Sequence, residues 1–307
     1  MKNKSFLLII TAIILVTGLF IIAISQEQPA TNNDTAHENQ EQADDTTEPE
    51  KKEDSPENDD GNEKEEDKTL GEDIKESFTD ALENAVGLFL KKDLKIVAIG
   101  DSLTQGVGDD TEKGGYVGIL EENLRNEELN PNLRIENYGK RGNRTDQLIK
   151  RMQTEEISTS LEDADIVLIT IGANDVMKVI KDNFQNLDYQ DFVEVQDQYK
   201  QNLEEIFQMI LEKNPDASIY HLGLFNPFEG YFTNIPEMGQ IMSDWNQIGI
   251  EVSEEYDAVT FIPIEDLFMN PEETLLWEDH FHPNKKGYKL IAERVLEYIR
   301  PDIEQNQ

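Results

Sequence analysis

The feature that most constrains the fold is a regular alternation of short apolar runs with longer segments of helical spacing between residues 94 and 299. The apolar runs are rich in β-branched residues, which is typical of buried strands. They cover residues 94–100, 133–138, 164–171, 218–225 and 259–263, and the helical segments cover residues 116–125, 145–152, 190–213, 236–256 and 283–299. Strands that alternate with helices form a parallel sheet flanked by helices, so the sequence predicts an α/β fold with five parallel strands.

The first 25 residues are predicted to direct the chain to a membrane. An apolar run of about 19 residues, residues 6–24, follows a short basic start and nearly reaches the ~20 residues that span a bilayer. Its length favours an uncleaved anchor, whereas Ala23 and Ser25 would also allow a signal peptide that is cleaved before Gln26. In both cases the basic end stays inside. We therefore expect the domain on the extracellular face of the cell membrane, or secreted if the segment is cleaved.

Residues 26–69 are predicted to be an acidic, disordered linker. They contain hardly any large apolar side chain, so they cannot bury enough surface to offset the entropy lost on ordering. Residues 70–90 have helical spacing and are expected to lead into the folded domain. The predicted organisation is an anchor or signal peptide at residues 1–25, the linker at 26–69 and one folded domain at 70–307.

Charge and residue usage exclude several functions. The formal net charge of −38 argues against binding to nucleic acid, because phosphates would be repelled. It also argues against docking of the folded domain on anionic lipids, so the expected membrane contact is through the N-terminal segment. The chain has no cysteine, which excludes disulfides, cysteine-ligated zinc and a lipid-modified cysteine.

Polar segments stand at the ends of the predicted strands, where parallel α/β sheets bind ligands. Ser102 lies in a Gly-Asp-Ser-Leu turn after the first strand, a glycine-rich segment at residues 137–145 follows the second, and Asn174 lies in a Gly-Ala-Asn-Asp segment after the third. Residues 279–283 precede the last helix. Taken singly, each of the three strand-end segments has a structural alternative, which is a turn or a helix cap.

The segment before the last helix contains the candidates for a general base. Asp279 and His282 are three residues apart, so one tight turn can bring the carboxylate to the imidazole. Of the other histidines, His37 lies in the acidic linker and His221 lies in a predicted strand. His280 and His282 are therefore the histidine candidates near strand ends.

Together, the four segments resemble the four sequence blocks of the GDSL lipase/acylhydrolase family, also called SGNH hydrolases, in order and in topological place over about residues 94–299. The resemblance implies a three-layer α/β/α sandwich with a central parallel five-stranded sheet, flavodoxin-like in style, and no metal or organic cofactor. It implies that Ser102 is the nucleophile. His282 would act as general base and then as general acid, and Asp279 would orient it.

The resemblance also implies an oxyanion hole. Its donors would be the backbone N–H groups of Ser102 and Gly142 and the side chain of Asn174. Acyl transfer builds negative charge on the carbonyl oxygen, and loss of one such donor typically costs ~10²–10³ in rate. The expected cycle is acylation of Ser102, loss of the alcohol, and attack of water on the acyl-enzyme.

Two further segments have open interpretations. Lys140 and Arg141 stand before Gly142 and Arg144 stands just after it, where many relatives have small residues before this glycine. One hypothesis is that Arg141 and Arg144 bind an anionic group of the substrate, and the alternative is ion pairing with nearby acidic residues. Residues 224–242, rich in Phe, Tyr, Pro and Met, would line an acyl pocket, form a flap, or pack between strand and helix.

The favoured prediction is a serine hydrolase of carboxylic esters that acts on a small ester, a lipid or an acylated polymer. Two other functions remain open. A metal-dependent hydrolase could use Glu278, Asp279, His280 and His282, because such side chains suit zinc or iron. A non-catalytic module could keep the fold as a reader of surface lipid or carbohydrate. No required protein partner is inferred.

Overall fold

The computed structural model describes residues 94–111, 113–125, 133–183, 185–227, 237–270 and 274–303. These residues all belong to one compact unit, Glu65–Gln307. The predicted anchor or signal peptide, the linker and the leading helix, which together span residues 1–90, lie outside the described residues. Within the described ranges, no helix is both long and apolar enough to span a bilayer.

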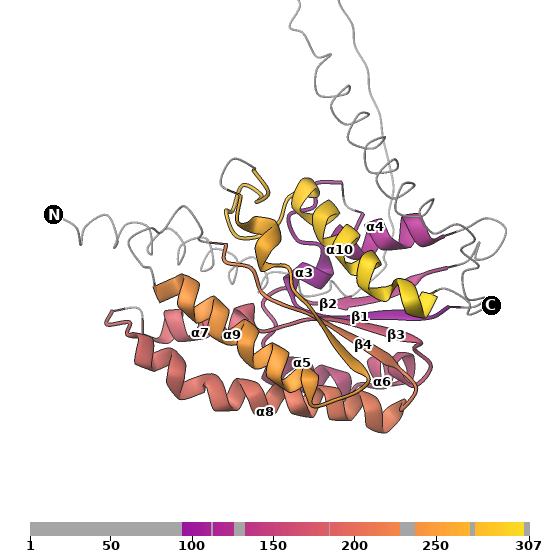
Figure 1. The fold of residues 1–307 in the computed structure, drawn as a ribbon, viewed down its shortest axis with the longest axis horizontal. Helices are drawn as coiled ribbons and strands as arrows, with labels where there is room; N and C mark the ends of the chain where they lie inside the picture. Colours follow the sequence, from indigo (N-terminus) through magenta and orange to yellow (C-terminus); the bar gives the residue numbers. More distant parts are fainter. Residues whose placement is uncertain are drawn as a thin grey trace, which may run out of the picture. The chain divides into compact units, whose positions relative to one another are not determined.

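A five-stranded sheet lies at the centre of the described domain, and all its strands run parallel (Figure 1). The strands lie in the order β2-β1-β3-β4-β5. They are β1 (Ile96–Gly100), β2 (Ile135–Gly139), β3 (Ile166–Thr170), β4 (Ser218–Leu222) and β5 (Val259–Ile262). The five predicted strands are thus confirmed, with small shifts at their ends.

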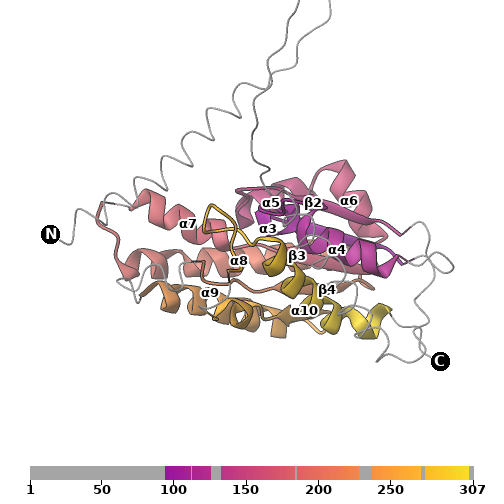
Figure 2. The ribbon, with the colours of Figure 1, turned by 90° about the horizontal axis from the view of Figure 1, so that it is seen from above.

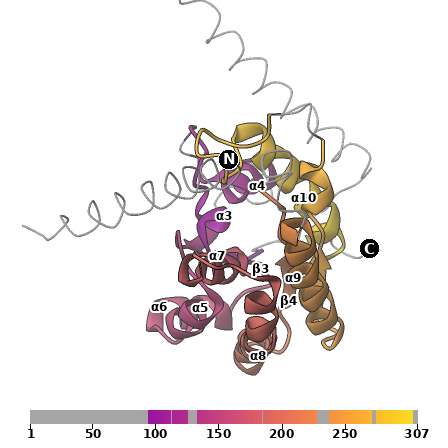
Figure 3. The ribbon, with the colours of Figure 1, turned by 90° about the vertical axis from the view of Figure 1, so that its left-hand side faces the viewer.

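Helices cover both faces of this sheet and complete three layers (Figure 1, Figure 3). Side chains alternate between the two faces of a strand, so Val97 and Ile99 enter one core and Ile96 and Ala98 enter the other. The second core is covered by α4 (Gly115–Leu124) and α10 (Lys285–Ile303). The first is covered by α5 (Thr145–Met152), α6 (Glu155–Glu162), α7 (Ala173–Asp182), α8 (Tyr189–Lys213) and α9 (Glu237–Glu254).

The longest described helix, α8, runs beside α9 (Figure 2). Between them, the Trp245 ring stacks on Tyr199 with 5.6 Å between ring centroids, and Phe192 meets the same indole edge-on at 6.3 Å. Aromatic pairs of this geometry add to the stability that burial supplies. The two helices therefore pack against each other within the layer that covers the first core.

The strand order changes direction beside β1, and this change creates room for a site. The chain passes from β1 to β2 on one side and then crosses back to β3 on the other side. Gly100 pairs with Gly139 and with Thr170, so β1, β2 and β3 end at the same level. Ligands of open α/β sheets bind in the crevice at such a point. The segments that carry Ser102, Gly142 and Asn174 all begin there.

Some helical elements were absent from the periodicity-based prediction. They are α3 (Ser102–Gln105), α6, α7 and the 3₁₀ helix η1 (Glu265–Phe268). Both α3 and η1 are about one turn long, which is too short to show a period. In α6 only Ile157 and Leu161 are buried. Helix α7 begins inside the polar segment 172–175, with Gly172 as its N-cap residue and no side-chain cap.

Candidate active site

Ser102 lies at a sharp turn between β1 and α3. Gly100 has a φ of 146°, and a Cβ at this position would lie 2.1 Å from the carbonyl oxygen of Thr170, so the turn requires glycine. Asp101 caps α3 by accepting a hydrogen bond from the N–H of Leu103 at 3.0 Å. The Gly-Asp-Ser-Leu segment is therefore a helix cap and also places a serine at a strand end. The N–H of Ser102 lies in the first helical turn, where N–H groups have no intrahelical partner.

Ser102, His282 and Asp279 form one row of hydrogen bonds. Oγ of Ser102 lies 2.8 Å from Nε2 of His282, and Nδ1 of His282 lies 2.5 Å from Oδ2 of Asp279. The serine and the histidine are both buried. Because a carboxylate can only accept, Nδ1 carries the proton and Nε2 accepts the hydrogen of the serine hydroxyl. Such a row can turn a serine into a nucleophile.

The loop before α10 holds Asp279 ready to orient the imidazole. Oδ1 of Asp279 accepts hydrogen bonds from the backbone N–H groups of Phe281 at 3.0 Å and His282 at 2.9 Å. His280 adopts a left-handed φ of 53° within the same tight turn. Burial acts to raise the pKa of Asp279, but the hydrogen bonds from the His282 ring and backbone hold this pKa below its ordinary value. The carboxylate is therefore ionised at neutral pH.

The loop after β2 is fastened to β1 and to α3. The N–H of Lys140 donates to the carbonyl oxygen of Gly100 at 3.0 Å, and the N–H of Arg141 donates to Oε1 of Gln105 at 2.6 Å. Gly142 follows with a φ of 79°. A Cβ at Gly142 would meet no described atom within 4 Å, so the space on this side of the loop is open.

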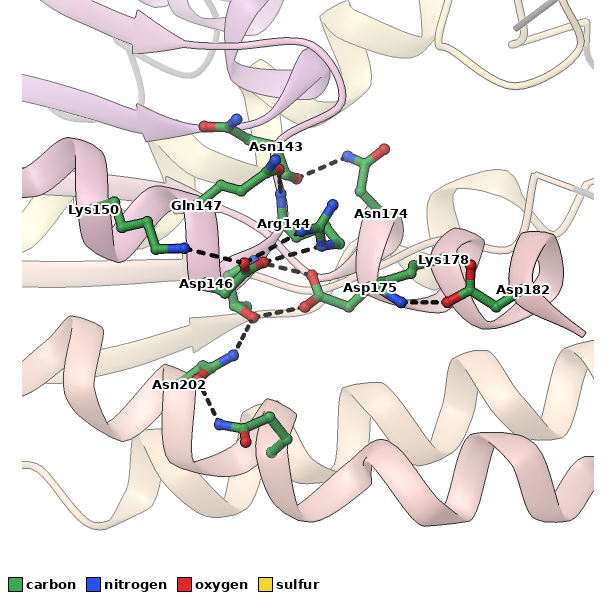
Figure 4. A network of polar contacts seen from close by, with 12 residues as sticks. Asn143, Arg144, Asp146, Gln147, Lys150, Asn174, Asp175, Lys178, Asp182 and Asn202 are labelled. Atoms are coloured by element: carbon green, nitrogen blue, oxygen red, sulfur yellow. Dashed lines mark hydrogen bonds and ion pairs between the residues drawn. The ribbon is translucent and has the colours of Figure 1, made fainter. Parts of the chain in front are cut away.

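Asn174, at the start of α7, is joined to the same loop (Figure 4). Its Nδ2 donates to the carbonyl oxygen of Asn143 at 3.0 Å. A side-chain amide has two N–H donors, so the second one remains for a ligand. The structure thus brings Asn174 close to the segment that carries Gly142, from the ends of two different strands.

Arg151 also supports this loop, and sequence reasoning missed it. Its Nη2 donates to the carbonyl oxygen of Tyr138, and its Nη1 donates to Oδ1 of Asn143, both at 2.7 Å. The side chain therefore joins the end of β2 to the loop. In the sequence, Arg151 is one of two adjacent basic residues, with Lys150, at the end of a predicted helix, and such residues ordinarily face solvent or the helix dipole.

Arg141 and Arg144 both lie against acidic side chains. Nη2 of Arg141 is 3.9 Å from Oδ2 of Asp279, and Nε of Arg144 is 3.0 Å from Oδ1 of Asp146. These contacts agree with the ion-pairing interpretation of the basic segment. Binding of an anionic substrate group by Arg141 or Arg144 stays a prediction.

An apolar hollow opens beside Ser102 and His282. Its empty volume is about 560 Å³, with the solvent at its mouth included. Leu224, Phe225 and Pro227 line it, which agrees with the acyl-pocket interpretation of residues 224–242, while residues 228–236 lie outside the described ranges. The apolar side chains of the lining come mainly from α7, α9 and the segment after β4, among them Val176, Met177, Leu224, Phe225, Pro227 and Met242.

The acidic and histidine residues before α10 are not arranged as a metal centre. Asp279 and His282 face one another and Ser102, whereas Glu278 and His280 are exposed. Among the described residues, no group of three or more His, Cys, Asp or Glu side chains is placed to hold a metal ion. The geometry therefore favours the serine-based interpretation of this cluster.

Comparison with known proteins gives a consistent set of relatives. A sequence model of the GDSL-like Lipase/Acylhydrolase family matches residues 98–290, which include Ser102, Gly142, Asn174, Asp279 and His282. The uncharacterized protein YpmR of Bacillus subtilis is 35% identical over 214 residues, covering 69% of this chain and 84% of that protein. The spore germination lipase LipC of Bacillus licheniformis is 26% identical over 206 residues, covering 66% and 94%.

Solved structures share the fold. The lipase Lip_vut3 from a goat rumen metagenome superposes with a TM-score of 0.58 at 23% identity, covering 66% of this chain and 96% of that one. At this level of identity the likeness concerns the architecture alone. It agrees with the predicted three-layer α/β/α sandwich.

Proposed function

We propose that this chain, which belongs to the GDSL-like Lipase/Acylhydrolase family and is an ester hydrolase, cleaves carboxylic esters through an acyl-enzyme on Ser102. One observation carries the proposal: Ser102, His282 and Asp279 form a hydrogen-bonded row at the edge of an apolar hollow. In this proposal Ser102 is the nucleophile, His282 transfers protons, and Asp279 orients the imidazole.

Acylation of Ser102 is the first half of the proposed reaction. Oγ of Ser102 attacks the carbonyl carbon while Nε2 of His282, at 2.8 Å, takes the hydroxyl proton. When the tetrahedral intermediate collapses, the bond from carbon to the alcohol oxygen breaks, and the imidazolium gives its proton to that oxygen. In the second half His282 deprotonates a water that attacks the acyl carbon, which releases the acid and restores Ser102.

The negative charge of each tetrahedral intermediate needs donors at the carbonyl oxygen. We assign this role to the N–H groups of Ser102 and Gly142 and to the Nδ2 of Asn174. Support comes from their places at three neighbouring strand ends and from the open side of Gly142. Donors held by the backbone cost no reorganisation when the charge forms, which is why they stabilise it strongly.

The apolar hollow supports an ester with an apolar acyl chain longer than acetyl. Its lining is mostly aliphatic, aromatic and thioether side chains, which gain free energy from contact with methylene groups. The spore germination lipase of Bacillus licheniformis among the compared proteins is in line with this substrate class. We therefore propose a lipid or another long-chain ester as substrate.

Hydrolysis of p-nitrophenyl esters from acetate to palmitate by the full chain tests both parts of the proposal. We expect a chain-length optimum above acetate, because each buried methylene contributes about 0.8 kcal/mol. Ser102→Ala is expected to lower kcat by about 10⁴-fold or more, because the nucleophile is removed. Ser243→Ala, which changes an exposed serine of α9, is the matched control and should keep wild-type activity.

The two parts fail separately. If Ser102→Ala remained as active as the wild type, the acyl-enzyme mechanism would be wrong. If acetate were the best substrate and Ser102→Ala were inactive, the serine mechanism would stand and the long-chain substrate would be wrong.

The same assay tests whether Arg141 and Arg144 bind an anionic group. Support comes from their places on either side of Gly142 in a chain of net charge −38. On this hypothesis, Arg141→Glu slows hydrolysis of an anionic ester more than that of a neutral ester with the same acyl chain. An equal effect on both esters would instead reflect the loss of the contact between Arg141 and Asp279.

We propose that the enzyme works outside the cytoplasm. Support comes from the sequence: a basic start, the apolar residues 6–24 and the acidic residues 26–69 precede the domain. An apolar run of this length after basic residues is typical of a signal anchor, and a shorter core is typical of a cleaved signal peptide. The domain would then meet membrane lipids and surface polymers as substrates.

A further inference from the structure

We propose that Asp175, Thr145 and Asn202 form a positioning device that sets the geometry of the oxyanion hole by tying α7 and α8 to the loop that carries Gly142. The inference rests on the proposed acyl transfer at Ser102. It assigns these three side chains no contact with substrate.

Two neighbouring residues of α7 hold the same loop (Figure 4). Asn174 donates to the carbonyl oxygen of Asn143 at 3.0 Å. Asp175 accepts twice from Thr145, from its N–H at 3.1 Å and from its hydroxyl at 2.6 Å, and uses a different carboxylate oxygen for each. Since Gly142 directly precedes Asn143, the distance between the Gly142 N–H and the Asn174 amide depends on these three hydrogen bonds.

Asn202 of α8 fixes the orientation of the Thr145 hydroxyl. Its Nδ2 donates to Oγ1 of Thr145 at 2.7 Å, and Gln198 donates to Oδ1 of Asn202 at 2.9 Å from one turn earlier in α8. Thr145 is 0% exposed and Asn202 is 8% exposed. The hydroxyl must therefore accept from Asn202 and donate to Asp175. A buried network with its hydrogen bonds formed specifies one arrangement of the atoms it joins.

A side chain of α5 also joins the loop to the end of β2. Arg151 of α5 donates to the side chain of Asn143 and to the carbonyl oxygen of Tyr138. Side chains from α5, α7 and α8 thus contact Asn143 and Thr145, which follow Gly142 in the chain. Because three helices hold this loop, the Gly142 N–H and the Asn174 amide keep their spacing when negative charge develops on a substrate oxygen. An oxyanion hole requires such fixed spacing.

The use of a carboxylate at this depth points to the same role. Burial raises the pKa of Asp175 to about 6, so keeping it ionised at neutral pH costs stability. Its hydrogen bonds go to Thr145, which is 30 positions away, while α7 has Gly172 as its N-cap residue and no side-chain cap. The Asp175 carboxylate therefore serves to hold Thr145, at the end of the loop that carries Gly142.

Asp175→Asn tests the proposal, because it keeps the size of the side chain and replaces one acceptor oxygen by a donor. One of the two Thr145 donors then loses its partner. We expect kcat to fall about 10- to 100-fold, less than for direct loss of an oxyanion donor, with KM changed by less than about 2-fold. Thr145→Val should behave alike, and Thr145→Ser, which keeps the hydroxyl, should restore kcat to within about 3-fold of wild type.

A trifluoromethyl ketone with the preferred acyl chain gives the readout that a merely structural role would not move. It forms a tetrahedral adduct with the serine, whose oxyanion occupies the hole. If the network positions the hole, the inhibition constant of the ketone rises by the same factor as kcat/KM falls across the variants. A fall in kcat with an unchanged inhibition constant would overturn the proposal.

The matched control is Asp182→Asn, which makes the same change on the same helix at an exposed ion pair with Lys178. Its kcat should equal that of the wild type. If thermal unfolding shows that Asp175→Asn is not folded, Asn202→Ala replaces it, since both hydrogen bonds of the carboxylate survive, and an approximately 3- to 10-fold fall in kcat is expected.

Wild-type kcat in folded Asp175→Asn, or in folded Asn202→Ala, would overturn the positioning role. If Ser102→Ala were inactive in the same experiment, the proposed function would stand although the positioning role had failed. An active Ser102→Ala would instead overturn the proposed function.

Discussion

Asp101 directly precedes Ser102, Asp279 precedes His282 by three residues, and the two carboxylates differ in electrostatic state. The pKa of Asp279 lies below its ordinary value because His282 donates to it from ring and backbone. Burial raises the pKa of Asp101 to about 7, although Leu103 and Thr170 donate to it. At the residue scale, burial therefore determines the direction of the pKa shift of Asp101, and hydrogen bonding determines that of Asp279.

Asp101→Asn is expected to stabilise the protein increasingly as the pH rises. Since the folded-state pKa of about 7 exceeds the ordinary value of 3.8, folding favours the protonated carboxyl. The stability contributed by this protonation is complete below about pH 4 and is lost as the pH rises through about 7. Asparagine keeps the acceptor oxygen without the charge. The free energy of unfolding of the variant relative to wild type should rise by on the order of 1–3 kcal/mol between about pH 4 and pH 8.

Urea denaturation of the full chain at both pH values measures this difference. Asp163→Asn, which removes an exposed aspartate paired with Lys95, is the control for loss of a surface charge. A difference between Asp101→Asn and wild type that does not change with pH would contradict the expectation.

At the element scale, backbone turns decide where the polar side chains stand. The turn from β1 to α3 and the loop after β2 both contain a glycine with positive φ, but their surroundings differ. Gly100 packs against the end of β3, whereas the Cβ position of Gly142 is open. Gly100 is needed because its φ is positive and because a side chain would not fit. Gly142 is needed only because its φ is positive.

Gly100→Ala and Gly142→Ala form a matched pair that tests this difference. The Cβ at position 100 would lie 2.1 Å from the Thr170 carbonyl oxygen, so β1 and β3 must separate, and we expect a loss of more than about 3 kcal/mol. At position 142 the left-handed conformation alone should cost about 1–2 kcal/mol. Thermal unfolding of both variants checks the order, and equal losses would contradict it.

At the scale of the whole molecule, the N-terminal sequence and the enzyme domain together predict where the reaction takes place. When the full chain is expressed in a bacterial host, we expect the domain in the membrane fraction and open to protease added to intact cells. A soluble cytoplasmic protein of the host, assayed in parallel, should stay protected. Release into the medium with a new N-terminus at Gln26 would favour the signal peptide over the anchor, and a domain in the cytosol would contradict both.

Local properties of the sequence were enough to predict the sheet and part of the site. Apolar runs and helical periods depend on neighbouring residues, so the five strands and the helices α4, α5, α8, α9 and α10 could be predicted. The contact between Asp279 and His282 could also be predicted, because a spacing of three residues closes within one turn. The places of Ser102 and Asn174 after the first and third strands followed from the same alternation.

Only the tertiary structure decided which distant side chains support the site. Thr145 meets Asp175 and Asn202 across separations of 30 and 57 residues, and these contacts depend on how α7 and α8 cross over the sheet. Arg151 and the apolar hollow likewise exist only once several elements pack together. A residue pattern records the period of each element, but the angle and depth at which two elements meet arise from the packing of the whole core.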